Sequence, residues 1–153
     1  QPFLSQIENG HTLPSMLTLY RLAGALGLSA AELMPAAVGP APIHVQRRED
    51  ARRVPVTESA NAGMGRILTA SGRRVVATEY VVGADEDMGD WFQSDGELLV
   101  YVADGRIVVT IEGQGEWELG TGDAMTYPGE LRNVWRVIGP ESATILLVHS
   151  PDA

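Results

Sequence analysis

The sequence predicts a mainly β protein in which a helical segment precedes a β-sandwich or barrel. Within residues 1–35, apolar side chains recur at the spacing of one helix face, as at Leu19, Leu22 and Leu26. From Arg66 onward the period becomes two, in short β-branched and aromatic runs separated by Gly, Asp and Pro turns. Because no strand–helix alternation is present, a doubly wound α/β fold is disfavoured.

The helical elements are predicted from their capping residues. Ser15 is a good N-cap for the helix that carries the leucines, and Gly27 ends it. The run at 29–33, SAAEL, has the Ser-x-x-Glu form of a capping box and opens a further short helix that Pro35 stops. An earlier short helix, PFLSQIE, is closed by Asn-Gly at 9–10.

The expected strands are short and rich in β-branched or aromatic residues. They are RRVVATEYVV (73–82), ELLVYVA (97–103), RIVVTIE (106–112), EWELG (116–120), DAMTYP (123–128), NVWRVI (133–138) and ATILLVH (143–149).

Residues 36–55 are predicted to link a helical domain at 1–35 to a β domain at 56–153. The stretch AAVGPAP cannot continue a helix, and QRREDARR is a charged run. A solvated connector is the simpler interpretation of this segment. A strip that contacts phosphates or a second subunit is the alternative.

Composition limits the functions that the chain can have. Its 153 residues are 44% apolar, which is enough for a packed core. The net charge is -9 and all 11 basic residues are arginine, so the chain lacks the basic balance of a free-standing nucleic-acid binder. It has no cysteine, which excludes disulfides and fits a cytoplasmic protein. Neither a signal peptide nor a run of membrane-spanning length is present, so we expect no membrane partner.

The segment FLSQIENGHTLPSMLTLYRLAGALGLSAAELM, residues 3–34, resembles the C-terminal part of the lambda-repressor-like, or XRE-family, helix-turn-helix. In such domains the second helix of the motif lies in the major groove. The resemblance places Gln1, Pro2, Ser5 and Gln6 on that helix, where glutamine can pair with adenine. It implies that the following positions lie near backbone phosphates: His11, Thr12 and Ser15, the last at a helix N-terminus.

The first helices of this family are absent from the chain, which begins at Gln1 rather than at a methionine. Between residues 1 and 35 only Arg21 is basic. We therefore expect that the chain is a piece of a longer protein and that by itself it binds DNA poorly. The alternative interpretation of residues 1–35 is a helical arm that packs on the barrel.

Two stretches of the β region resemble the cupin superfamily, and in particular the small sensor cupins fused behind XRE-family helix-turn-helix domains. They are ELLVYVADGRIVVTIEGQGEWELGTGDAMTYP, residues 97–128, and YPGELRNVW, residues 127–135. The resemblance implies a double-stranded β-helix, or jelly-roll barrel, and the order of the two modules is part of it.

Metal-binding cupins take two histidines and a glutamate from a first motif and one histidine from a second. The resemblance places Asn133 at the second-motif histidine and Leu98 at the glutamate. The first-motif histidines correspond to Phe92 and Ser94, or to Trp91 and Gln93 if the loop is shifted by one residue.

The only histidines of the chain, His11, His44 and His149, are too scattered to chelate by local spacing. We therefore predict no bound metal, no other cofactor and no catalytic residue. The acidic stretch at 84–97 is interpreted as a solvated loop, with a hard-cation site as the alternative.

A small-molecule pocket is predicted inside the barrel in place of a metal. By the period-two rule, Asn133 and Trp135 face the same way, and we expect both to point inward. Trp91 or Phe92 is expected at the mouth. Further polar or aromatic candidates are Tyr101, Tyr127, Glu79, Tyr80 and His149. Such walls suit a small molecule, and the alternative is that these side chains simply fill the barrel.

Together these features predict a DNA-binding transcriptional regulator. Its partners would be a double-stranded DNA operator, a small-molecule effector bound by the metal-free cupin domain, and a second copy of the chain, since such domains bind two half-sites as dimers. One alternative is a metal-independent isomerase or epimerase with His149 or a tyrosine as base. The other is a ligand-free dimerisation module.

Overall fold

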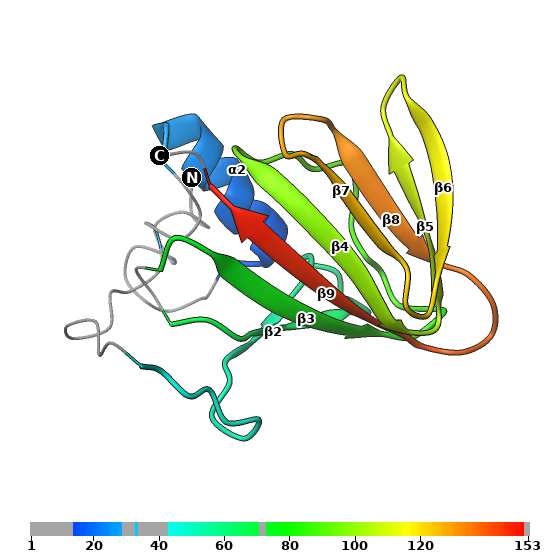
Figure 1. The fold of residues 1–153 in the computed structure, drawn as a ribbon, viewed down its shortest axis with the longest axis horizontal. Helices are drawn as coiled ribbons and strands as arrows, with labels where there is room; N and C mark the ends of the chain where they lie inside the picture. The colour runs from blue at the N-terminus through cyan, green and yellow to red at the C-terminus, as the bar shows by residue number, and fades with distance from the viewer. Residues whose placement is uncertain (1–13, 29–32, 34–42, 71–72, 152–153) are drawn as a thin grey trace.

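Two antiparallel sheets face each other in the part of the chain that the computed structural model describes, residues 14–28, 33, 43–70 and 73–151 (Figure 1). The six-stranded sheet has the order β1 (Arg53–Pro55), β2 (Met64–Ile67), β3 (Val76–Val82), β9 (Ala143–Ser150), β4 (Glu97–Asp104), β7 (Ala124–Pro128). The three-stranded sheet has the order β6 (Gly115–Gly120), β5 (Arg106–Ile111), β8 (Asn133–Val137). The two sheets are not joined into a closed barrel.

The alternation of side chains along the strands builds the core between the sheets. On β9, for example, residues 143, 145, 147 and 149 are buried, while the intervening residues are only partly so. The strand runs expected from the sequence are confirmed as β3 to β9. β1 and β2 were not expected, and β1 falls within the stretch that the sequence assigns to the linker. With three residues, β1 is too short to show a period.

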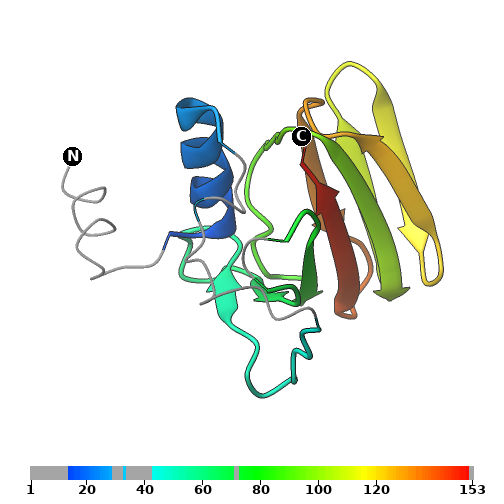
Figure 2. The same ribbon diagram turned by 60° about the vertical axis from the view of Figure 1, so that its left-hand side comes forward.

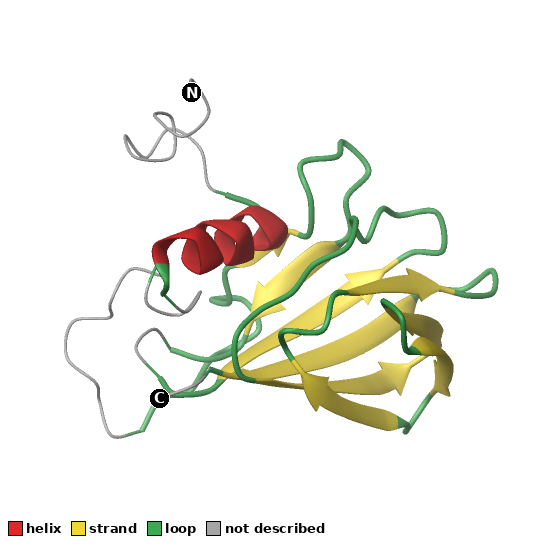
Figure 3. Ribbon diagram, turned by 90° about the horizontal axis from the view of Figure 1, so that it is seen from above, coloured by secondary structure: helices red, strands yellow, loops and turns green. Residues whose placement is uncertain are grey.

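One α-helix, α2 (Met16–Leu26), packs beside the sheets (Figures 2 and 3). It begins as expected at Ser15, whose side chain accepts a hydrogen bond from the Thr18 N–H at 3.2 Å. It ends as expected at Gly27, which has the left-handed conformation with φ 65°. The helices expected over 2–8 and 29–33 lie outside the described residues, apart from Leu33. None of the described helical structure is long and apolar enough to cross a membrane.

The turn between β4 and β5 passes close to the start of β9. Gly105 has φ +83°, and a Cβ built on it would lie 2.7 Å from the Ser142 carbonyl oxygen and 2.8 Å from the Ala143 Cα. Gly113, in the turn between β5 and β6, has φ +72° but nothing within 4 Å of such a Cβ. Gly105 is therefore required both by its positive φ and because a side chain would not fit, whereas Gly113 is required only by its positive φ.

Gly105→Ala and Gly113→Ala form a matched pair that separates these two requirements. We expect Gly113→Ala to lower the free energy of unfolding by about 1–2 kcal/mol through backbone strain alone. Gly105→Ala should lower it by roughly a further 1–3 kcal/mol, because the added methyl group collides with backbone atoms that cannot move aside. Urea unfolding measures both values, and equal losses would contradict the close approach of this turn to β9.

Candidate ligand cavity beneath the helix

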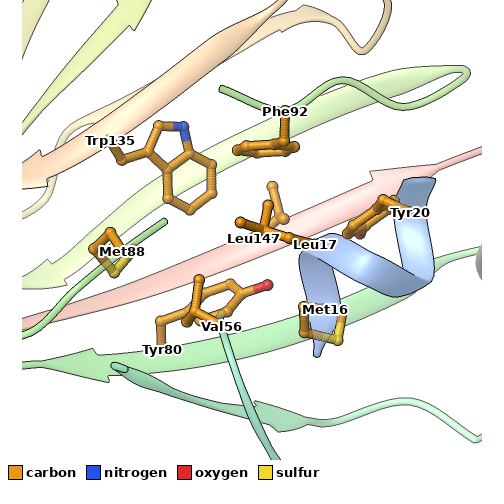
Figure 4. A pocket seen from close by; sticks show the side chains of 9 residues that line it. All are labelled: Met16, Leu17, Tyr20, Val56, Tyr80, Met88, Phe92, Trp135 and Leu147. Atoms are coloured by element: carbon orange, nitrogen blue, oxygen red, sulfur yellow. The ribbon is translucent and has the colours of Figure 1, made fainter. Parts of the chain in front are cut away.

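A cavity of about 20 Å³ lies where α2 meets the two sheets (Figure 4). The 9 side chains that line it are apolar or aromatic, and none is charged: Met16, Leu17, Tyr20, Val56, Tyr80, Met88, Phe92, Trp135 and Leu147. They come from the helix, from β3, β8 and β9, and from the loops around them. The cavity thus joins the helical segment to both sheets.

Few interactions fasten α2 to the sheets. The Leu17 N–H donates to the Val56 carbonyl at 3.3 Å. The Leu17 side chain packs against Gly89, where a Cβ would lie 3.4 Å from its Cγ and still closer to a terminal methyl group. A small cluster around Val54 of β1 buries Met16, Tyr20 and Ala23. The helix is therefore held mainly by apolar contacts, whereas each inner strand is held by backbone hydrogen bonds to a neighbouring strand on either side.

The N-terminus of α2 is occupied by a carboxylate of the β domain. The Ser15 hydroxyl donates to Glu58 Oε1 at 2.6 Å, and the Thr18 hydroxyl donates to the same oxygen. Ser15 is 2% exposed. The expectation that Ser15 offers a free helix N-terminus to a DNA phosphate does not fit this arrangement, because Glu58 takes the anion position. The other predicted DNA-binding residues, Gln1, Pro2, Ser5, Gln6, His11 and Thr12, lie outside the described residues.

Asn133 points inward, as expected from the sequence, and is the centre of a buried hydrogen-bond network. Tyr127 Oη donates to Asn133 Oδ1 at 3.1 Å, and Trp135 Nε1 donates to Tyr127 Oη at 3.1 Å. Asn133 Nδ2 donates to the carbonyl oxygens of Phe92 at 3.2 Å and Leu131 at 3.0 Å. Burial raises the pKa of Tyr127, so its hydroxyl stays protonated near neutral pH. Every polar group of this network therefore has a partner.

Comparisons with known proteins agree with this architecture. A helix-turn-helix family model matches residues 1–33, which include the whole of α2. An RmlC-like cupin family protein with a double-stranded β-helix fold, from Methanocaldococcus jannaschii, is 14% identical over 74% of this chain and 94% of its own, with a TM-score of 0.55. The β domain has a cupin fold. The search of curated proteins found no match.

Some solved structures resemble nearly the whole chain. Hydroxypropylphosphonic acid epoxidase from S. wedmorenis is 19% identical, and the similarity covers 97% of this chain and 82% of the epoxidase, with a TM-score of 0.61. A structure described as Fe(II) HppE is 20% identical over 97% of this chain and 83% of its own, with a TM-score of 0.60. At these identities the likeness establishes the fold alone. A helix-turn-helix segment followed by a cupin fold is the arrangement that the sequence predicts.

Two of the positions that the cupin resemblance assigns to metal ligands, Phe92 and Asn133, are neighbours in the fold, but their side chains offer no atom suited to bind a metal. Phe92 and Asn133 form an antiparallel bridge, with both N–H···O contacts at 2.9 Å. One carries a phenyl ring and the other a fully bonded amide, and Leu98 is a buried apolar residue. Within the described residues, no three His, Cys, Asp or Glu side chains gather in one place. These side chains do not fit a transition metal, and the absence of a metal stays a prediction.

His149 is buried beside the cavity rather than on its lining. Its Nε2 lies 2.8 Å from the Asp95 carbonyl oxygen, and because a carbonyl can only accept, Nε2 carries the proton. In the neutral imidazole the Nδ1 atom then carries a lone pair, and it has no hydrogen-bond partner in the structure. The ring of Tyr20 packs edge-on at 5.7 Å between centroids, and its buried hydroxyl also lacks a partner.

Three predicted pocket residues lie away from the cavity. Trp91 is half-buried and lies under the Arg132 guanidinium, 5.8 Å from the ring centroid. Glu79 pairs with Arg66 at 2.6 Å. Tyr101 is 38% exposed on the outer face of β4. Of the other predicted residues, Phe92 and Trp135 line the cavity, and Asn133, Tyr127 and His149 lie buried around it.

Sequence reasoning missed the helix wall of the cavity. Met16, Leu17 and Tyr20 lie on a face of α2 that the sequence analysis did not single out, because the predicted helix face followed Leu19, Leu22 and Leu26. The aromatic Tyr20 and the pair of methionines Met16 and Met88 were the available signals, because such side chains are common in adaptable pockets.

Glu58→Gln tests the cap on α2. Burial acts to raise the pKa of Glu58, but the hydrogen bonds from Ser15 and Thr18 outweigh it, and the net shift is downward. A lowered pKa means that the charged form stabilises the fold above the ordinary carboxyl pKa of about 4.3, and that this contribution is lost as the pH falls through the folded-state value. At neutral pH we expect Glu58→Gln to reduce stability by about 0.3–1 kcal/mol, which is the usual size of a helix-terminus charge effect.

Stability measured from pH 7 to pH 3 checks this expectation, with the exposed Glu141→Gln as control. The difference between wild type and Glu58→Gln should shrink toward zero at the acid end. A difference that is constant with pH would show that the carboxylate charge has no part in holding α2.

Proposed function

We propose that this chain is part of a DNA-binding transcriptional regulator whose cupin domain binds a small-molecule effector in the cavity beneath α2. One observation carries the proposal. The helix that supplies Met16, Leu17 and Tyr20 to the cavity lies in the segment that matches the helix-turn-helix family. A molecule in the cavity would touch the DNA-binding module directly.

The small size of the cavity supports coupling between effector and helix. About 20 Å³ is the room that a single buried water needs. A larger molecule therefore enters only if a wall shifts. The sheet walls are hydrogen-bonded ladders, whereas α2 is fastened by the Leu17–Val56 hydrogen bond, the Glu58 cap and apolar contacts. The helix is thus the wall that yields, and the effector acts by binding its shifted position more tightly than the docked one.

We propose that DNA binding resides in the matched helix-turn-helix segment, with Gln1, Ser5 and Gln6 reading base edges as the family resemblance implies. The protein would act as a homodimer on two half-sites. The outer face of β4 supports a partner for the β domain, because Leu99 is a large apolar side chain that is 36% exposed.

Regulation is favoured over catalysis by the contents of the cavity. An isomerase or epimerase needs a titratable group in reach of the substrate. No carboxylate lines this cavity, and its only ionisable lining groups are tyrosines. The imidazole beside it, that of His149, has no hydrogen-bond partner at Nδ1 that could deliver or remove a proton there. Burial raises the pKa of both Tyr20 and Tyr80, so neither is a base near neutral pH. For the same reasons we propose that the effector binds without a metal.

The first test of this function is DNA retardation by the full-length protein that contains this chain. We expect sequence-specific binding to a pseudo-palindrome near its own gene. The logarithm of the affinity should fall linearly with the logarithm of the salt concentration, because each phosphate contact releases counterions. Retardation that is absent, or that is equal for unrelated DNA, would reject the proposal.

A second test separates coupling from simple destabilisation. Leu147→Ala enlarges the cavity from the β9 side, whereas Leu119→Ala removes the same side chain on β6, away from α2. Each substitution should destabilise the fold by about 2–5 kcal/mol. We expect only Leu147→Ala to change the affinity for DNA, by at least threefold, in a retardation titration at a temperature where both variants are folded. An equal response from the two variants would show that the cavity and the DNA-binding module are independent.

A further inference from the structure

Two buried polar atoms have no hydrogen-bond partner, one on a side chain that lines the cavity and the other on a ring packed against that side chain. Within the described residues these are Tyr20 Oη, from α2, and His149 Nδ1, from β9. Their rings meet edge-on, with centroids 5.7 Å apart. Buried polar groups are normally paired, and an exception that borders a cavity indicates a position where a guest polar atom is favoured. We name this pair the Tyr20–His149 corner.

The protonation states of the corner define what a guest must offer. The Nε2 proton of His149 is used by the Asp95 carbonyl, so neutral His149 presents an acceptor lone pair at Nδ1. Burial and the nearby Asp95 carboxylate raise the pKa of Tyr20, so its hydroxyl remains neutral and can donate or accept. A guest therefore needs a hydrogen-bond donor to satisfy His149, and the same group can accept from Tyr20.

The charge of the guest is limited by its surroundings. No charged side chain lines the cavity. The nearest carboxylate, Asp95, has its Oδ1 3.2 Å from His149 Nε2, on the protonated side of the ring. An anion would be buried without a cation to pair with it, and a cation would be separated from Asp95 by the imidazole. Both cases carry the desolvation cost of an unpaired charge.

The shape of the guest is limited by aromatic walls. Trp135 meets Tyr80 at 6.0 Å with an interplanar angle of 84°, and Phe92 at 5.6 Å with an angle of 74°. Edge-to-face contact is also a geometry that a further aromatic ring prefers. The two methionines, Met16 and Met88, are unbranched and change rotamer easily, so they can make room as α2 shifts (Figure 4).

We infer that the effector is an uncharged, ring-containing small molecule with a hydroxyl or N–H donor, and that this donor binds at the Tyr20–His149 corner. This inference rests on the proposed function, because it specifies the ligand of the same cavity. It adds a chemical class and two residues that orient the ligand.

Three single-ring probes test this class: phenol has the donor, toluene has the same size and lacks it, and the somewhat larger benzoate adds a negative charge. Their binding is followed by titration of the Trp135 indole N–H signal in NMR spectra, assigned with the Trp135→Phe variant. We expect phenol to bind about tenfold more tightly than toluene, the ratio given by one net hydrogen bond. Benzoate should not bind at concentrations that saturate with phenol.

Tyr20→Phe removes one half of the corner and preserves the ring, and Tyr101→Phe is the same change on the exposed face of β4. The preference for phenol over toluene should fall to about threefold or less in Tyr20→Phe and stay unchanged in Tyr101→Phe. The ¹⁵N shift of His149 Nδ1 gives a measurement that needs no variant. It should move with phenol and not with toluene, because only phenol donates to this nitrogen.

The inference is overturned if benzoate binds as tightly as phenol, if toluene equals phenol, or if no probe binds up to its solubility limit. The last result would mean that the corner holds a water molecule only. DNA retardation in the presence of the same probes keeps the two proposals apart. A probe preference without any DNA binding would reject the proposed function alone, whereas specific DNA binding without the probe preference would reject the ligand class alone.

Discussion

The packing of α2 against the cupin sheets is the constraint on which the cavity depends. Met16, Leu17 and Tyr20 are 3–6% exposed, and the β domain covers the side that faces the cavity. Without this contact the space between β3, β8 and β9 would be open to solvent at that end, and the Glu58 carboxylate would have no helix to cap. A segment that matches a helix-turn-helix family thereby forms one wall of the cavity in the cupin fold.

Local signals were sufficient to predict most of the fold. Ser15 and Gly27 were recognised as helix ends because capping depends on residue type within one turn. Asn133 and Trp135 were placed together because strand parity requires it. The facing of β3 could not be derived in this way. Alternation along the strand puts Glu79 and Tyr80 on opposite faces of β3, but it does not say which of the two faces inward. The pairing of β3 with β9 determines that Tyr80 faces the core.

The cavity itself could not be predicted, because its walls come from segments far apart in the sequence. Tyr20 and His149 meet only when α2 lies across β9, and no pattern in either segment indicates that contact. β1 was missed for a related reason. It becomes a strand by pairing with β2 at the sheet edge, and three residues carry no periodicity of their own.

The two polar groupings around the cavity differ in a way that bears on function. In the Asn133 network, the amide oxygen accepts from Tyr127 and the amide nitrogen donates to two carbonyls, so this wall is satisfied and rigid. In the Tyr20–His149 corner, one atom belongs to the helix and the other to the sheet, and neither is satisfied. A ligand whose polar group bonds to both atoms binds most tightly when α2 stays within reach of β9. The ring of the same ligand, however, needs room and pushes the helix outward. These opposing demands favour a defined second position of α2 over its release. Such a position is what a ligand needs in order to shift a two-state equilibrium, because a ligand bound equally in both states shifts nothing.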